Sequence, residues 1–263
     1  MMFARLFVSI LLAALGCSAA VVQDEAQCLP LVQDGSGWTT VVTVVNLEAK
    51  PSRFELTFRP AKGLPTEWTI GLRAPCAEVE GHIVRGSLPV GGSIAIETTG
   101  TSKDIQRGYA QLFGFQSARL GLRAIVRKEG GSTLVVDGAA EREDAIRLPF
   151  DNSGGSSTSL VWVSETDYAL VNMIVFAADG KELLRDQFQF SVAGPVSQEM
   201  FHLEERYPQL RGVRGVVDLE VTYPNAGFYD RMLFSAIAIQ TEPTGLAFVQ
   251  ESLTTQRWKP MRY

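Results

Sequence analysis

Two similar stretches of sequence, Thr39–Asn46 (TTVVTVVN) and Ser157–Ser164 (STSLVWVS), decide the predicted fold. In each stretch apolar side chains recur at every second position, which is typical of a β-strand with one buried face. Aligning the two stretches places Val44 opposite Trp162, both on the apolar face. We therefore expect Trp162 to be a core residue rather than a platform for a ligand.

The sequence around these stretches repeats in the same order. Gly, Pro, Ser and Asp interrupt the chain roughly every 8–12 residues, a spacing that favours a β-sandwich or barrel over alternating strands and helices. The further matches are Leu29–Trp38 with Leu148–Gly155, Arg107–Leu112 with Arg214–Leu219, and Leu120–Arg127 with Leu233–Gln240. The predicted fold class is all-β, with two tandem, mutually similar antiparallel β-sandwich (Ig-like) domains. We place them at residues 24–143 and 144–263, with the boundary near Glu141–Ile146.

These motifs resemble uncharacterised tandem β-sandwich repeats of secreted bacterial proteins. The resemblance rests on the pattern D-G-x-G-W-T-T-x-x-x-x-V-N at residues 34–46, G-Y-A at 108–110 and L-x-x-x-A-x-V-R at 120–127. The second copy has D-N-S-G-G-S-S-T at 151–158 and F-x-x-E-x-x-Y-P at 201–208, where a short helix ending at Pro208 is expected. The resemblance covers most of residues 29–252 and implies export and a β-sandwich. It implies no catalytic residues.

The first twenty residues have the pattern of a signal peptide. Arg5 precedes an apolar run from Leu6 to Leu15, and small residues follow. The run is too short to span a bilayer, which needs about 20 apolar residues, and we expect no mature transmembrane helix. Two processing routes remain open: cleavage after Ala20, or lipidation at Cys17 in a sequence resembling a bacterial lipobox. Either route predicts an exported protein in the periplasm, at the cell surface or outside the cell.

The mature chain then retains Cys28 and Cys76. An even pair of cysteines in an oxidising compartment favours a disulfide between them. The alternative is two buried thiols without a bond. Two cysteines without neighbouring histidines make a poor zinc site.

The composition and the motifs point away from catalysis. A formal net charge of −5 excludes a basic nucleic-acid-binding surface. His82 and His202, the only histidines, lie in no metal-binding spacing, and there is no G-x-S-x-G nucleophile motif. The run Asp151–Gly155 is interpreted as a turn, because it has too few carboxylates for a calcium site. We therefore predict no cofactor, no metal and no enzymatic activity.

One candidate contact surface stands out. Alternation places aromatic side chains on the outward face of one strand and arginines on one face of the next. If residues 107–127 form a hairpin, both groups share an outer sheet face that could stack on sugar rings and pair with acidic groups. The alternative is that the second domain, the 61–87 insertion or another subunit covers it. The surface consists of Tyr109, Phe113, Phe115, Arg119, Arg123 and Arg127.

The sequence thus favours an exported, non-enzymatic binding or adhesion module that contacts an envelope polymer, a glycan or a protein. One alternative is a structural envelope component that oligomerises through edge strands. Another is a periplasmic assembly chaperone, although no chaperone motif is recognisable. An enzyme would need carboxylates brought together from distant strands.

Overall fold

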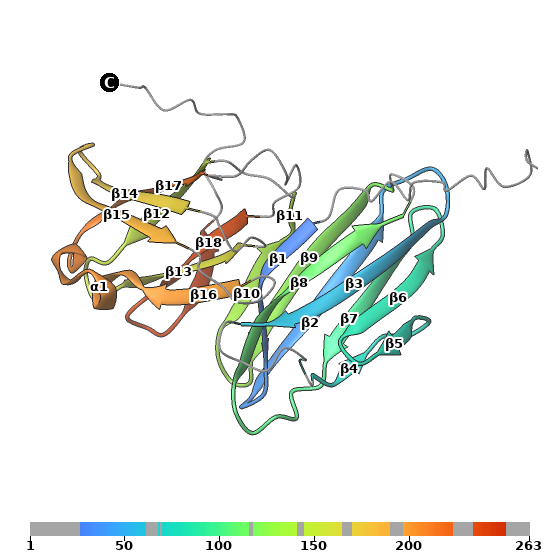
Figure 1. Cartoon of the computed structure of the whole chain (residues 1–263). Helices are drawn as coiled ribbons and strands as arrows, with labels where there is room; N and C mark the ends of the chain where they lie inside the picture. The colour runs from blue at the N-terminus through green and yellow to red at the C-terminus, as the bar shows by residue number, and fades with distance from the viewer. Residues whose placement is uncertain are drawn as a thin grey trace, which may run out of the picture.

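The computed structural model describes residues 27–61, 68, 70–115, 118–140, 145–164, 170–189, 197–222 and 234–250. The predicted signal peptide, Cys17 and boundary residues 141–144 lie outside these ranges. The described chain is all-β, as predicted, and its strands pair in antiparallel sheets (Figure 1). No helix within the described residues is long and apolar enough to cross a membrane.

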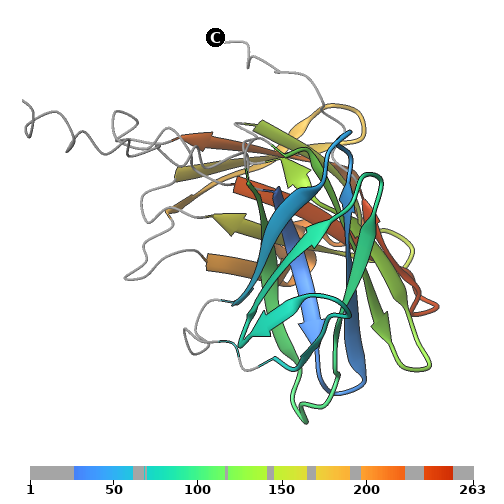
Figure 2. The same ribbon diagram turned by 90° about the vertical axis from the view of Figure 1, so that its right-hand side faces the viewer.

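The strands before residue 141, called the first half below, form two sheets that enclose one hydrophobic core. One sheet has the spatial order β11 (Ala139–Ala140), β1 (Gln27–Asp34), β8 (Gln106–Gly114), β3 (Ser52–Pro60), β6 (Ile83–Leu88) and β5 (Glu78–Glu80). The other has the order β10 (Thr133–Asp137), β9 (Leu120–Lys128), β2 (Trp38–Asn46), β7 (Ser93–Thr98) and β4 (Leu72–Arg73). In Figure 2 these strands, blue to green, stand nearest the viewer.

The strands after residue 144, called the second half, form two further sheets around a second core. One sheet has the order β12 (Ala145–Asp151), β17 (Arg214–Thr222), β14 (Leu170–Ala177) and β15 (Glu182–Gln189). The other has the order β16 (Ser197–His202), β13 (Ser157–Ser164), β18 (Phe234–Thr241) and β19 (Ala247–Gln250). The short helix expected near Phe201–Tyr207 is α1 (Leu203–Arg206), because Phe201 and His202 still belong to β16. Pro208 begins a 3-10 turn, η1 (Pro208–Leu210).

The strand orders of the two halves correspond. The order β1-β8-β3-β6 matches β12-β17-β14-β15, and β10-β9-β2-β7 matches β19-β18-β13-β16. The aligned stretches of sequence therefore occupy corresponding strands. Two alignments are wrong by a residue. Val42 pairs with Ala124 and Leu160 pairs with Ala238, so Leu120 corresponds to Phe234 and not to Leu233. Val32 pairs with Gly108 and Phe150 pairs with Gly215, so Val32 corresponds to Phe150 and not to Asp151. These errors matter because a slip of one residue reverses the faces of a strand.

A buried threonine holds the first strand of each half to the second. Thr40 Oγ1 accepts a hydrogen bond from the amide of Gln33 at 3.0 Å and donates to its carbonyl oxygen at 2.7 Å. Thr158 Oγ1 makes the same two bonds to Asp151, at 3.0 and 3.1 Å. A hydroxyl both donates and accepts, so one side chain satisfies both backbone groups of an edge residue.

The predicted core positions are confirmed in both halves. Val42 and Val44 are fully buried in the first core, and Leu160 and Trp162 in the second. Trp162 packs on the rings of Phe188, at a centroid distance of 4.9 Å, and Phe201, at 5.1 Å. The alternating apolar pattern therefore identified the inner face of these strands correctly.

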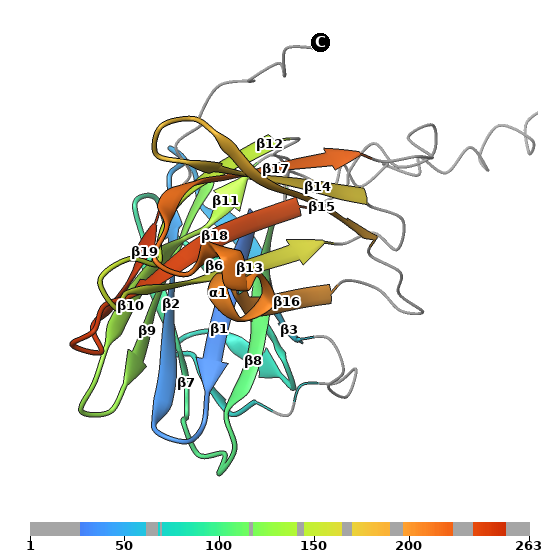
Figure 3. The ribbon, with the colours of Figure 1, turned by 90° about the vertical axis from the view of Figure 1, so that its left-hand side faces the viewer.

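The outer face of the sheet containing β13 is buried as well, because it packs on the first half. Val161, Ile237 and Ile239 belong to the same buried cluster as the first core, while Val163 packs with Cys28 and Tyr109. Figure 3 shows this sheet lying between the β14–β17 layer and the strands of the first half. This contact between the halves is called the junction below.

A β-bulge in β1 lies at the junction. Leu29 pairs with Ala110 and Val32 pairs with Gly108, so two residues of β1 oppose the single residue Tyr109. The buried Gln198 of β16 donates from Nε2 to the carbonyl oxygens of Pro30, at 2.5 Å, and Gly108, at 2.6 Å. One amide of the second half thus satisfies two carbonyl groups at the bulge of the first.

Candidate functional site

The contact surface predicted from the sequence is not formed as one surface. Tyr109 and Phe113 lie on β8, and Phe115 directly follows it. Arg123 and Arg127 lie on β9, which belongs to the other sheet. β8 and β9 therefore do not pair as the predicted hairpin. The aromatic and arginine side chains therefore point away from opposite outer faces of the first half.

The predicted surface residues have different environments. Tyr109 is fully buried at the junction beside Cys28 and Val163, so the second half covers it. Phe113 is half-buried, and Phe115 is 41% exposed. The arginines are exposed, and Arg123 forms an ion pair with Asp137 across β9 and β10. Of the six, Tyr109 is a packing residue, and the remainder form no continuous patch with it: Phe113, Phe115, Arg119, Arg123 and Arg127.

The predicted disulfide between Cys28 and Cys76 is not formed in this structure. Cys28 is buried on β1, whereas Cys76 is exposed in the turn between β4 and β5. The two thiols are not bonded to each other. The alternative of two buried thiols holds for Cys28 and fails for Cys76.

The polar side chains that sequence singled out as candidates for chemistry make local structural contacts. The imidazole Nδ1 of His202 lies 2.8 Å from Ser159 Oγ, but Ser159 is only 2% exposed and cannot reach a substrate. Asp151 Oδ1 accepts hydrogen bonds from the amide and the hydroxyl of Ser153, as expected for a turn. Within the described residues, no three His, Cys, Asp or Glu side chains gather as metal ligands.

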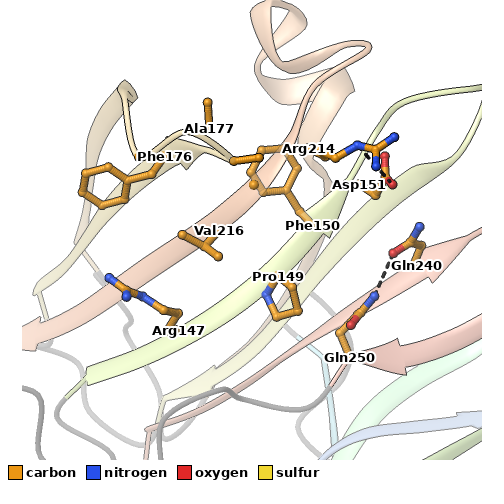
Figure 4. A pocket seen from close by; sticks show the side chains of 13 residues that line it. Arg147, Pro149, Phe150, Asp151, Phe176, Ala177, Arg214, Val216, Gln240 and Gln250 are labelled. Carbon is orange, nitrogen blue, oxygen red and sulfur yellow. Dashed lines mark hydrogen bonds and ion pairs between the residues drawn. The ribbon is translucent and has the colours of Figure 1, made fainter.

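A groove of about 740 Å³ lies on the outer face of β12, β17 and β14. Its floor is an apolar row across the three strands, in which Pro149 pairs with Val216 and Val216 pairs with Phe176. Figure 4 shows these side chains from close by. None of the six residues of the predicted contact surface lines this groove.

Ion pairs border the apolar row on both sides. Arg147 binds Asp218 through two hydrogen bonds of 2.6 and 2.5 Å. These bonds raise the pKa of Arg147 above its ordinary value, although partial burial opposes the rise. On the other side Arg214 lies 3.9 Å from the Asp151 carboxylate and donates to Ser153 Oγ at 3.1 Å.

Two amide side chains form the wall of the groove toward β18 and β19. Gln250 Nε2 donates to Gln240 Oε1 at 2.8 Å, as the dashed line in Figure 4 marks. The groove therefore combines an apolar floor, two arginines held by acidic partners, and an amide pair. These groups suit noncovalent contact with a partner that has both apolar and polar atoms.

Gly215, which lines the groove, has no room for a side chain. A Cβ atom on Gly215 would lie 1.9 Å from the carbonyl oxygen of Phe176. The corresponding residue of the first half, Gly108, would place a Cβ atom 2.0 Å from the carbonyl oxygen of Arg59. The repeated Arg-Gly dipeptide at 107–108 and 214–215 was the sequence signal that marked this place in both halves.

The groove corresponds to the face that the first half uses at the junction. By strand register Pro149 corresponds to Pro30, and Val216 corresponds to Tyr109. In the first half this face is covered by the sheet of β13, β16 and β18, whereas in the second half it is open. The same structural position is thus an intramolecular contact in one half and an exposed groove in the other.

Comparisons with protein-family models, with curated proteins and with solved structures found no match to this chain.

Proposed function

We propose that this protein is an exported, non-enzymatic binding module of two tandem Ig-like β-sandwich domains, residues 24–143 and 144–263. It acts at the cell envelope or outside the cell, and the groove on β12, β17 and β14 is its binding surface. The observation that carries this proposal is the correspondence between the groove and the face that is covered at the junction.

That correspondence favours a protein surface as the partner. The first half already holds the outer face of a β-sheet on this structural position. In the groove a partner buries the apolar row of Pro149, Val216 and Phe176 at the centre. Apolar contacts at the centre with polar groups at the rim are the usual arrangement of specific protein interfaces.

The charged border contributes to specificity. Arg147 and Arg214 keep their acidic partners without a ligand, so binding leaves no unpaired charge beneath the partner. Rim charges of this kind affect partner choice and the rate of association more than the final affinity. We therefore expect binding to weaken moderately as salt is raised.

A binding experiment with a matched control tests the proposal. The purified protein, its Val216→Arg variant and its Val79→Arg variant are immobilised and exposed to separated protein and polysaccharide fractions of the cell envelope. Val79 is a suitable control because it is 41% exposed on β5, far along the chain from the groove.

The expected result is capture of a protein component by the wild type and by Val79→Arg, with loss of capture by Val216→Arg. Equal binding by all three proteins would remove the groove from the mechanism. Capture of polysaccharide alone would contradict a protein partner.

A further inference from the structure

The junction joins two unlike faces. The first half contributes the outer side of β1 and β8, and the second half contributes the outer side of β13, β16 and β18. Since the halves have corresponding strand orders, each half has one such face that stays uncovered among the described residues. The second half keeps the groove, and the first half keeps the outer face of β10, β9, β2 and β7, called the free face below.

The free face has an apolar row of its own. Val135 pairs with Ile125, and Ile125 pairs with Val41, so three apolar side chains lie side by side across β10, β9 and β2. Val135 is 47% exposed, and the other two are half-buried. Glu97 of β7, which is exposed, pairs with Val41 and continues the row. The corresponding row of the second half contains Val249, Ile239, Ser159 and His202, and it faces the junction.

Charge at corresponding positions favours contact between the groove and the free face. At the junction Arg107 and His202 line one cavity of about 410 Å³. The residue that corresponds to Arg107 in the groove is Arg214, and the residue that corresponds to His202 on the free face is Glu97. A contact built like the junction would therefore bring an arginine and a glutamate of opposite charge together.

Two differences from the junction, one in the groove and one on the free face, complement each other. β12 runs in continuous register with β17 and has no bulge, so it does not present the two carbonyl groups that Gln198 binds in the first half. Gln198 pairs with Val163, and the corresponding partner of Val45 on the free face is Ser93. On the free face the short side chain of Ser93 takes the place of Gln198, and the groove has no bulge in β12 for a long amide to bind.

We propose that the occupant of the groove is a second copy of this chain. The free face of one copy covers the groove of the next, and Val45 packs on Val216 as their counterparts Val163 and Tyr109 pack at the junction. Glu97 of the first copy pairs with Arg214 of the second. This inference rests on the proposed function, and it names the partner.

Such an interface is heterologous, because the two contacting faces differ. A row of copies has an unoccupied groove at one end and an unoccupied free face at the other. The interface therefore extends into a linear assembly, or closes into a ring where the two ends meet. The protein then acts as a structural unit of the envelope or of the extracellular space.

Sedimentation velocity on the purified protein over a wide concentration range tests this inference. The Val216→Arg variant blocks the groove, Val135→Arg blocks the free face, and Val79→Arg is the control. Circular dichroism and the thermal midpoint of each variant establish that it is folded. We expect the wild type and the control to associate with rising concentration and each blocked variant to remain monomeric.

An equimolar mixture of the two blocked variants is the decisive sample. One variant retains a free face and the other retains a groove, so the mixture forms dimers and nothing larger. A mixture that stays monomeric, or a wild type that stays monomeric at every concentration, overturns the inference.

Charge reversal gives an independent measurement with less risk to folding. We expect Arg214→Glu and Glu97→Arg each to weaken association roughly tenfold, and the double variant to recover most of the loss. A double variant weaker than both single variants contradicts the assigned pair. If the wild type does not associate with itself but still captures an envelope protein through Val216, this inference fails and the proposed function stands. If neither binding depends on Val216, both fail.

Discussion

Gln198 Nε2 lies 2.5 Å from the carbonyl oxygen of Pro30, across 168 residues of sequence and from one half of the molecule to the other. The same atom donates to the carbonyl oxygen of Gly108 at 2.6 Å. Both carbonyl groups flank the bulge that β1 forms against β8. The relationship explains why the halves pack in one register, since the amide fits only where the bulge presents two acceptors.

Replacing Gln198 with leucine is expected to lower the free energy of unfolding by about 1–3 kcal/mol, because two buried carbonyl groups lose their donor. Urea denaturation measures the change. The matched control is Ser93→Ala at the corresponding exposed position of β7, which should stay within about 0.5 kcal/mol of the wild type. Equal stability of Gln198→Leu and the wild type would show that the bulge does not depend on this amide.

Replacing Gly108 or Gly215 with alanine is expected to destabilise the protein by about 2–4 kcal/mol each. The added Cβ atoms would lie 2.0 and 1.9 Å from backbone carbonyl oxygens, and a backbone cannot move aside as a flexible side chain does. Thermal unfolding followed by circular dichroism detects the change.

Gly131→Ala is the control for the glycine variants, because its Cβ atom would meet its nearest neighbour at 3.5 Å, an ordinary contact. We expect its thermal midpoint to stay near that of the wild type. A similar midpoint for Gly215→Ala would contradict the close approach of β14 and β17 beneath the groove.

The carboxyl group of Asp151, at the edge of the groove, is expected to make the stability of the protein depend on pH. Burial acts to raise the pKa of Asp151, but the hydrogen bonds from Ser153 and the charge of Arg214 outweigh it, so the pKa lies below its ordinary value. A carboxyl group with a lowered folded-state pKa stabilises the fold above its unfolded-state pKa of about 3.9. This contribution is lost as the pH falls from there through the folded-state pKa.

Denaturation of the wild type and of Asp151→Asn at several pH values tests the sign. The difference in unfolding free energy should be constant near neutral pH and should shrink as the pH falls below about 4. A difference that grows on acidification would show that the ionised carboxylate does not stabilise the turn.

The face assignments from sequence succeeded where one strand contains the whole signal. Val42, Val44, Leu160 and Trp162 are buried because alternation within a strand is a local property of the pleat. The prediction of a helix before Pro208 also rested on local sequence, and α1 ends at Arg206. These inferences needed no knowledge of what packs on the outer face.

The prediction of the contact surface was wrong because alternation along a strand does not show what packs on its outer face. Alternation places Tyr109 on the outward face of β8 correctly, but an outward face can be covered by another sheet. The same pattern also does not show whether two successive strands pair as a hairpin or belong to different sheets, and here the second arrangement separates Arg123 from the aromatic residues. The groove was missed because its floor residues come from three strands, distributed from Pro149 to Val216.

The sequence by itself determined the all-β class and the inner face of the repeated strands, because period-two alternation is encoded in neighbouring residues. Tertiary structure alone decided which outer face is buried and which is open. The two halves have corresponding strands, yet Tyr109 is buried at the junction while Val216 lines a groove. The physical reason is that exposure of an outer face depends on docking between sheets distant in sequence, through contacts such as that of Gln198 with Pro30.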